Sequence, residues 1–219
     1  MPIYNALDPQ THFRVAVDPA LKCDLAFIGH RLPDRESRVE EFFFRSATLA
    51  PEMSFVLGGE GWGDKKLPAN VRWIGHVPSE RHNVVNCSAR MVLNVNRDSM
   101  AKVGFSPPTR VFEAAGAGAC LITDMWEGVE HFFEPDTEIL IAKSAGDLAQ
   151  YLRQYDSDQG ARIGRAMQRR ALRDHSYASR AAEVDEIFRN LLLNVQSTPA
   201  PDLHFGATQT TSSSARRAV

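Results

Sequence analysis

Short apolar segments alternate with helix-like segments along most of this chain, and this alternation limits the folds open to it. The strand-like segments end at glycine or polar residues and cover 24–29, 53–57, 71–75, 91–95, 119–123 and 138–142. Helix-like patterns cover 37–49, 79–87, 147–155 and 162–173. Strands that alternate with helices usually pair in parallel, with helices on both faces of the sheet. The sequence therefore predicts a Rossmann-like α/β domain with a parallel sheet.

The stretch 104–128 is central to this prediction, because it reads as a loop, a short helix, a buried strand and a second loop. Serine suits the N-cap of a helix, proline its first turn and glycine its C-terminal end. The continuous apolar run 119–123 suits a strand that is buried on both faces. The expected helix has Ser106, Pro107 and Pro108 at its start, and Gly116 and Gly118 at its end.

One carboxylate, Glu113, lies in the middle of this otherwise apolar helix. Burying an ionised carboxylate without a partner is costly, so we expect Glu113 to face solvent or a ligand. Thr109 and Arg110 precede it by one turn. A helix N-terminus beside a guanidinium group suits an anion, and a carboxylate suits a sugar hydroxyl. The alternative interpretation is a surface carboxylate and an exposed arginine on a short helix.

Polar side chains follow several strands of the predicted sheet. Loops at the carboxyl ends of parallel strands meet at one edge, where ligands bind, so we expect these side chains to converge. Simpler interpretations stay open for three of the loops. Arg31 and Arg35 could pair with nearby carboxylates. Asn96 could stabilise a turn, and Asp124 could cap a helix. The residues expected to converge are Arg31, Asn96, Thr109, Arg110, Glu113 and Asp124.

Composition excludes some classes of partner. The net charge of −2 gives no reason to expect a nucleic-acid partner. No apolar run approaches the roughly 18 residues that a membrane span needs. Cys23, Cys87 and Cys120 are far apart and lack metal-ligand spacing, which favours a reduced, cytoplasmic protein. The Asp-x-Asp pattern at 156–158 lies in a polar turn, where aspartate caps a helix, so we predict no metal site and no cofactor.

The ends of the chain differ from its middle. Residues 1–22 contain three prolines and no clear period, and they predict a linker-like segment before a domain at 23–176. Residues 177–195 predict a separate helix with an apolar stripe, which must pack against something. Residues 196–219 are rich in serine, threonine, proline and alanine, and predict a disordered tail.

Four motifs occur in a fixed order along the domain. They are Gly-His-Arg-Leu-Pro-Asp-Arg at 29–35, Val-Arg-Trp-Ile-Gly at 71–75, Arg-Val-Phe-Glu-Ala-Ala-Gly-Ala-Gly at 110–118, and Leu-Ile-Thr-Asp at 121–124. Together they resemble the nucleotide-sugar-binding half of GT-B glycosyltransferases, and most of all the group named after the spore-maturation protein CgeB. The resemblance covers roughly residues 1–193.

The resemblance implies a site for a nucleotide-sugar donor. In GT-B enzymes the active site lies between this domain and a second Rossmann domain. It implies that Glu113 binds the ribose, that Arg31 and Arg35 bind the diphosphate, and that Gly75 lies near the base. Retaining members carry a second glutamate at the position of Phe105, so the resemblance implies no retaining outcome here. The predicted donor-binding residues are Gly29, Arg31, Arg35, Gly75, Asn96, Thr109, Arg110, Glu113 and Asp124.

We therefore expect metal-independent glycosyl transfer from a nucleotide-diphosphate sugar linked to UDP, dTDP or GDP. No residues match the amino-terminal, acceptor-binding domain of the family, so we expect a donor half that is either truncated or paired with a separate acceptor-domain polypeptide. Self-association through the helix at 177–195 is a further alternative. Two alternatives stay open. One is a non-catalytic module that binds a nucleotide or a protein, and the other is a different Rossmann-like enzyme such as a nucleotide-sugar epimerase.

Overall fold

A six-stranded sheet organises residues 2–197, which the computed structural model describes. Its strands are β1 (Cys23–Ile28), β2 (Phe55–Gly58), β3 (Val71–Trp73), β4 (Ala89–Asn94), β5 (Leu121–Asp124) and β6 (Leu140–Ala142). The strand order is β3-β2-β1-β4-β5-β6, and every neighbouring pair is parallel. The predicted Rossmann-like sheet is confirmed. Because the order reverses between β1 and β4, a crevice is expected at the carboxyl ends of these strands.

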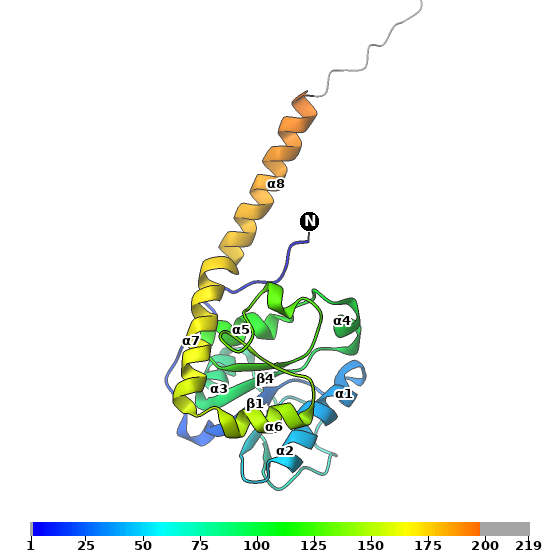
Figure 1. Ribbon diagram of the computed structural model, residues 1–219, viewed down its shortest axis with the longest axis vertical. Coiled ribbons are helices and arrows are strands. Elements are labelled where there is room, and N and C mark those ends of the chain that lie inside the picture. Colours follow the sequence, from blue (N-terminus) through cyan, green and yellow to red (C-terminus); the bar gives the residue numbers. More distant parts are fainter. Residues whose placement is uncertain (1, 198–219) are drawn as a thin grey trace, which may run out of the picture. The chain divides into compact units, whose positions relative to one another are not determined.

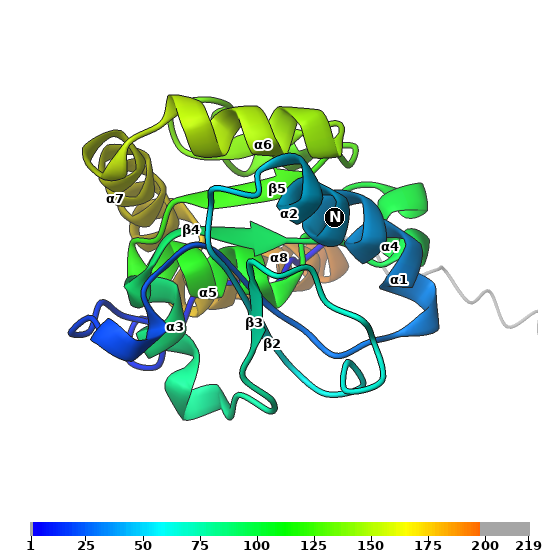
Figure 2. The same cartoon turned by 90° about the horizontal axis from the view of Figure 1, so that it is seen from below.

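Helices cover both faces of the sheet (Figures 1 and 2). One face carries α1 (Pro33–Val39), the π-helical turn η2 (Glu40–Arg45), α2 (Ser46–Leu49) and α6 (Ala145–Gln154). The other carries α3 (His82–Ser88) and α5 (Thr109–Ala117), with α7 (Ser157–Asp174) packed beside α5. Side chains of a strand alternate between the faces. Thus Leu25 and Phe27 join the aromatic core under η2, whereas Ala26 and Ile28 pack on the α3 side.

The helices α1 and α4 (Asp98–Val103) are the first to differ from the sequence-based prediction. The helix predicted at 37–49 begins earlier, at Pro33, because proline at the first helical position leaves no N–H group unsatisfied. The polar residues after Pro33 therefore form a helical turn. The short helix α4 lies within the predicted loop at 96–106. It buries none of its residues, so it has no apolar period that could reveal it.

The helix of the central stretch begins later than predicted. Pro108 is its N-cap residue, with an extended ψ of 152°, and the helical residues begin at Thr109. Ser106 is therefore not the cap, and neither proline lies in the first turn. A residue that precedes proline avoids the helical region, which keeps Pro107 out of the helix. Gly118 ends the helix as expected, in the left-handed conformation with a φ of 66°.

Residues 2–22, which the sequence predicts as linker-like, pack against the domain. Leu7 is fully buried. The N–H of Leu7 donates to the carbonyl of His175 at 2.7 Å, and the N–H of Tyr177 donates to the carbonyl of Leu7 at 3.0 Å. Gly116 does not end α5 but allows this approach, because a Cβ atom there would lie 2.5 Å from the carbonyl oxygen of His12.

The Asp-x-Asp pattern begins a helix. α7 starts five residues before the predicted 162, at Ser157. The carboxylate of Asp156 accepts from the N–H of Gln159 at 2.8 Å, and the Gln159 side chain accepts from the N–H of Asp156 at 2.9 Å. This reciprocal capping box confirms that Asp156 acts as a helix cap.

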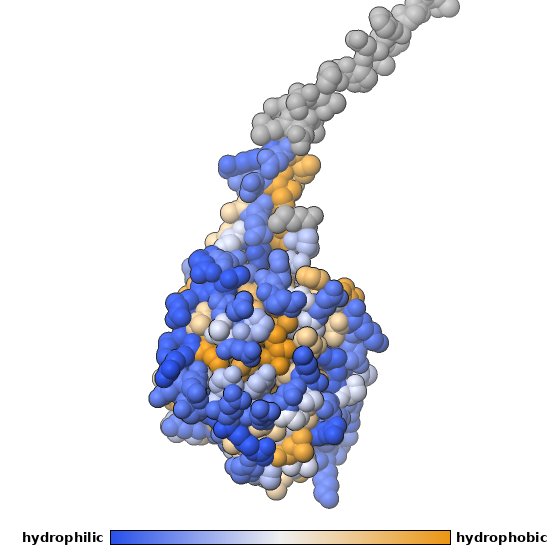
Figure 3. Space-filling view, viewed as in Figure 1, coloured by the Kyte–Doolittle hydropathy of each residue, from blue (hydrophilic) through white to orange (hydrophobic). Residues whose placement is uncertain are grey.

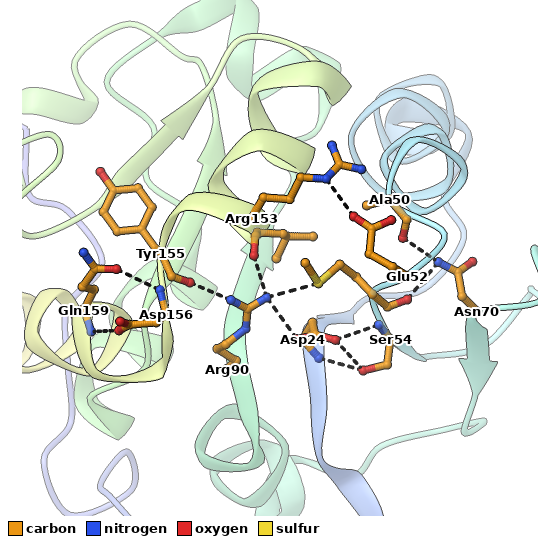
Figure 4. A network of polar contacts seen from close by, with 12 residues as sticks. Asp24, Ala50, Glu52, Ser54, Asn70, Arg90, Arg153, Tyr155, Asp156 and Gln159 are labelled. Atoms are coloured by element: carbon orange, nitrogen blue, oxygen red, sulfur yellow. Dashed lines mark hydrogen bonds and ion pairs between the residues drawn. The ribbon is translucent and has the colours of Figure 1, made fainter.

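A polar network closes the edge of the sheet at the amino ends of β1 and β4 (Figure 4). Arg90 donates to the carbonyl oxygens of Tyr155 at 2.6 Å and Leu152 at 2.8 Å. It also lies 3.0 Å from Oδ1 of Asp24, whose other oxygen accepts from the N–H and the hydroxyl of Ser54. This network ties β1 and β4 to the end of α6, and its hydrogen bonds hold the loops at this edge in place.

The last helix, α8, runs from Tyr177 to Ser197, two residues beyond the predicted end. It passes from a compact unit that ends at Glu183 into a second unit that begins at Val184. In the second unit Phe188, Leu191 and Leu192 are exposed, and apolar surface is visible along this part of α8 in Figure 3. The disorder predicted for 198–219 lies outside the described residues. No helix within residues 2–197 is both long and apolar enough to cross a membrane.

Candidate functional site

A cavity of about 460 Å³ opens at the carboxyl ends of β1 and β4. This is the point where the strand order reverses, and ligands of open parallel sheets bind there. The first turn of α5 forms one wall. The glycine and polar residues of the lining are Asn5, Gly29, His30, Arg35, Gly59, His82, Asn94, Arg97, Thr109, Arg110 and Glu113.

A second hollow, of about 510 Å³, lies at the opposite edge of the sheet. It is bordered by the amino ends of β1 and β4, where the ion pair between Asp24 and Arg90 neutralises both side chains. Size alone does not decide between the two. Parallel sheets offer their flexible loops and helix N-termini to ligands at the carboxyl edge. The carboxyl-end cavity is therefore the candidate site.

Glu113 is the only carboxylate among the described residues that line this cavity. Its Oε2 atom lies 3.3 Å from Nδ1 of His82 and 3.1 Å from Nη1 of Arg110. Burial raises the pKa of Glu113, but the His82 hydrogen bond and the Arg110 charge outweigh it and hold the pKa at about 2. Glu113 is therefore ionised at neutral pH. It is tolerated in a mostly buried place because it is paired, rather than because it faces open solvent.

Three guanidinium groups line the same cavity, on Arg35, Arg97 and Arg110. Burial, together with the positive charges of Arg97 and Arg110, lowers the pKa of Arg35. Burial also lowers the pKa of Arg110, and the charge of Glu113 opposes this shift. Nε of Arg35 has no hydrogen-bond partner among the described residues, and the 3.1 Å ion pair of Arg110 Nη1 with Glu113 lacks hydrogen-bond geometry. The cavity thus has an excess of positive charge and free donors, which favours an anion.

The backbone around the cavity suits a close approach by a ligand. α5 begins without a side-chain cap, so its first N–H groups have no side-chain acceptor. Together with the exposed Thr109 they form a helix N-terminus, which favours an anion. At the end of β1, a Cβ atom on Gly29 would lie 2.7 Å from Nη2 of Arg35. Only glycine at position 29 therefore leaves room for the Arg35 guanidinium in its observed place.

The structure brings five of the nine predicted donor-binding residues into the cavity lining: Gly29, Arg35, Thr109, Arg110 and Glu113. Arg31 is not among them. Its guanidinium lies 2.6 Å from Glu36 and 2.9 Å from Asp64, so the alternative interpretation of Arg31 as a paired loop charge describes its contacts. Gly75 also lies outside the lining, although its carbonyl accepts from the N–H of the lining residue Gly59 at 2.7 Å.

Asn96 and Asp124 are buried in a polar network behind the cavity. Arg38 contacts Asp124 Oδ2 through Nη2 at 2.6 Å and through Nε at 2.8 Å. Asp124 also accepts from the N–H of Asn96, and the Asn96 side chain accepts from Asn94. Burial raises the pKa of Asp124, although the Arg38 charge opposes it. These contacts hold the ends of β4 and β5 together and leave no carboxylate oxygen exposed to a ligand.

Sequence reasoning did not select five polar residues of the lining: Asn5, His30, His82, Asn94 and Arg97. Nothing in the sequence signals the contact of His82 with Glu113, 31 positions away. Arg97 stands in a recognisable polar cluster after β4, which is a usable signal. Phe105 lies outside the lining, half exposed, with an unusual positive φ of 44°. No group of three or more metal-ligating residues occurs within 2–197.

The parallel sheet and its helices match the fold of one half of GT-B glycosyltransferases. A model of the family described as glycosyl transferase-like matches residues 35–186. The chain therefore belongs to the glycosyl transferase-like family. No curated protein matches it.

Solved glycosyltransferases share this fold. Sucrose-phosphate synthase from Thermosynechococcus elongatus superposes with a TM-score of 0.68 at 14% identity, over 88% of this chain and 52% of that one. HepE from Anabaena, solved with UDP-glucose, gives a TM-score of 0.66 at 12% identity, over 86% and 57%. This chain thus spans about half of their length. The carboxy-terminal domain of LpcC from Francisella tularensis gives 0.60 at 16% identity, over 78% and 99%.

Proposed function

We propose that this chain is the donor-binding half of a glycosyltransferase and binds a nucleoside diphosphate sugar in the carboxyl-end cavity. One observation carries this proposal. Three guanidinium groups and one ionised carboxylate share a cavity where the strand order reverses. In the proposed complex Arg35, Arg97 and Arg110 contact the diphosphate, and Thr109 adds a hydroxyl contact at the start of α5. Glu113 accepts hydrogen bonds from the ribose.

The proposed chemistry is transfer of the glycosyl group from the diphosphate to an acceptor. The bond between the anomeric carbon and the diphosphate oxygen breaks, so negative charge grows on the leaving diphosphate. Arginine side chains and a helix N-terminus stabilise such charge when they are already in place. The buried guanidinium of Arg110 meets this requirement, because Glu113 and its own helix hold it. Metal-independent transfer remains a prediction.

We also propose a donor, a subgroup of the family and a location for the acceptor site. HepE was solved with UDP-glucose, which makes a UDP-linked sugar the first donor to test. The motifs at 29–35 and 110–118 support membership of the CgeB group within the wider family. Because the matched glycosyltransferases are about twice as long, the proposal assigns the acceptor site to a further polypeptide part.

A thermal-shift titration of the full chain with UDP, GDP, dTDP and ADP tests the donor site. A ligand at 100 times its dissociation constant stabilises the native state by about 2.7 kcal/mol. We expect a shift with at least one nucleotide, and we expect Glu113→Ala to abolish it. Glu130→Ala, at an exposed carboxylate outside the cavity, is the matched control and retains the shift.

The outcomes separate the candidate functions. Cooperative melting without a shift from any nucleotide contradicts the donor site. Binding without hydrolysis or transfer, even with an added acceptor polypeptide, favours the non-catalytic module. Conversion of the sugar while it stays on the nucleotide identifies an epimerase.

A further inference from the structure

The first residue of α3, His82, faces Glu113 inside the cavity. The helices α3 and α5 pack side by side, and Nδ1 of His82 lies 3.3 Å from Oε2 of Glu113. Both side chains line the cavity and are mostly buried, with 19% of His82 and 15% of Glu113 exposed. A polar contact that is shielded from bulk water is stronger than the same contact on the surface.

The hydrogen of this contact belongs to the imidazole. An ionised carboxylate only accepts hydrogen bonds, so Nδ1 of His82 must carry the hydrogen. Neutral histidine with its hydrogen on Nδ1 can make this bond, and so can protonated histidine. The contact therefore does not depend on the charge of His82.

Both protein partners of Glu113 use the same carboxylate oxygen. His82 and Arg110 contact Oε2, and within residues 2–197 no group hydrogen-bonds to Oε1. Two contacts on one oxygen fix the rotation of the carboxylate. Oε1 is therefore left as the free acceptor in a cavity whose other charged groups are donors.

We propose that His82 is a positioning residue that fixes the Glu113 carboxylate, and that the site consequently discriminates against nucleotides whose sugar lacks both the 2′- and the 3′-hydroxyl. This inference rests on the proposed function, in which Glu113 contacts the sugar of the nucleotide. A ribose hydroxyl donates to the free Oε1. A sugar without that hydroxyl leaves a buried, ionised acceptor unsatisfied, which is costly. A carboxylate that rotates freely discriminates less, because part of the binding free energy is lost in ordering it.

Isothermal titration calorimetry of the full chain tests this inference with UDP, GDP and ADP, each beside its 2′,3′-dideoxy counterpart. We expect wild type to bind at least one ribonucleotide roughly tenfold more tightly than its dideoxy form. His82→Leu brings that ratio close to one. His82→Asn retains most of it, since an asparagine amide nitrogen can occupy the place of Nδ1. His131→Leu, at an exposed histidine outside the lining, leaves the ratio unchanged.

A ratio in His82→Leu that equals the wild-type ratio overturns the positioning role, while wild-type binding and its loss in Glu113→Ala still support the proposed function. An equal loss of affinity in His82→Leu for a ribonucleotide and for its dideoxy counterpart also overturns the positioning role, because loss of a merely structural residue weakens both alike. His82→Ala replaces the leucine variant if that variant does not melt cooperatively. If wild type binds no nucleoside diphosphate, the proposed function and this inference fail together.

Discussion

The contacts of a buried carboxylate decide whether it stabilises the fold or is available to a ligand. Glu113 and Asp124 both follow apolar segments and both are mostly buried. The Asp124 carboxylate accepts from Arg38 and from the backbone N–H of Asn96, so its role is to stabilise the fold. Glu113 keeps one oxygen free inside a cavity that is rich in guanidinium groups. The same side-chain chemistry therefore supports the structure at one position and a ligand at the other.

The substitution Asp124→Asn tests this distinction. It leaves the mostly buried Arg38 guanidinium without its close carboxylate, and breaking such a pair costs about 3 kcal/mol of unfolding free energy. Urea denaturation measures this loss. Asp98→Asn is the matched control, because Asp98 approaches Arg38 only to 3.9 Å and is more exposed, so its removal costs less than about 1 kcal/mol. Nucleotide affinity of folded Asp124→Asn should equal that of wild type, and a loss of affinity without a loss of stability would contradict the structural role.

Sequence reasoning at the residue scale succeeded where topology alone brings groups together. Thr109, Arg110 and Glu113 were found because they lie on α5, which connects β4 to β5 and therefore begins at the carboxyl edge. Sequence reasoning could not tell which of Arg31 and Arg35 lines the cavity, because both lie in the segment after β1. Glu36 and the sequence-distant Asp64 together hold Arg31 away from the cavity, and the contact with Asp64 depends on the fold.

At the scale of elements, close backbone packing fixes how the helices meet the sheet. Gly164 lies within α7 where this helix crosses the end of α5. A Cβ atom at this position would lie 2.4 Å from the carbonyl oxygen of Gly118 and 2.7 Å from the carbonyl carbon of Ala119. Both neighbours are backbone atoms, which cannot move aside as a flexible side chain can. The packing of α7 on α5 therefore depends on glycine at position 164.

Gly164→Ala should destabilise the protein by about 1–3 kcal/mol, although alanine is the better helix former. Gly146→Ala in α6 is the matched control, because its nearest neighbour is the Ser144 hydroxyl at an ordinary 3.5 Å. We expect that change to be neutral or to stabilise by up to about 1 kcal/mol. Thermal melts of both variants check the prediction. Equal melting temperatures of the two variants would mean that α7 does not pack as closely as observed.

The elements that sequence reasoning identified are those whose apolar pattern is continuous. All six strands were predicted. Strands such as β2 and β5 are buried throughout and read as apolar runs, whereas the edge strand β3 exposes Arg72 and Trp73. The short helix α4 was missed because it buries nothing. The packing of residues 2–22 was missed because only Ala6, Leu7 and Leu21 of this segment are buried, and three residues so placed show no period.

On the scale of the whole molecule, the two edges of the sheet have different roles. The amino edge is closed by hydrogen bonds from Arg90 to the end of α6, and its carboxylate and guanidinium neutralise each other. The carboxyl edge holds the start of α5, three guanidinium groups and the ionised Glu113 around a cavity of similar size. This asymmetry follows from parallel pairing, which collects all the β-to-α loops at one edge. The central claim is that a nucleoside diphosphate binds at the carboxyl edge.

Hydrogen exchange of the full chain, measured by mass spectrometry with and without saturating nucleoside diphosphate, tests this claim most directly. Ligand binding slows exchange of the amides that it orders or contacts. We expect protection in peptides that cover 29–36 and 109–113, at the end of β1 and the start of α5. Protection confined to 86–90 and 117–120, which border the hollow at the amino edge, would place the ligand on the wrong side of the sheet and contradict the account.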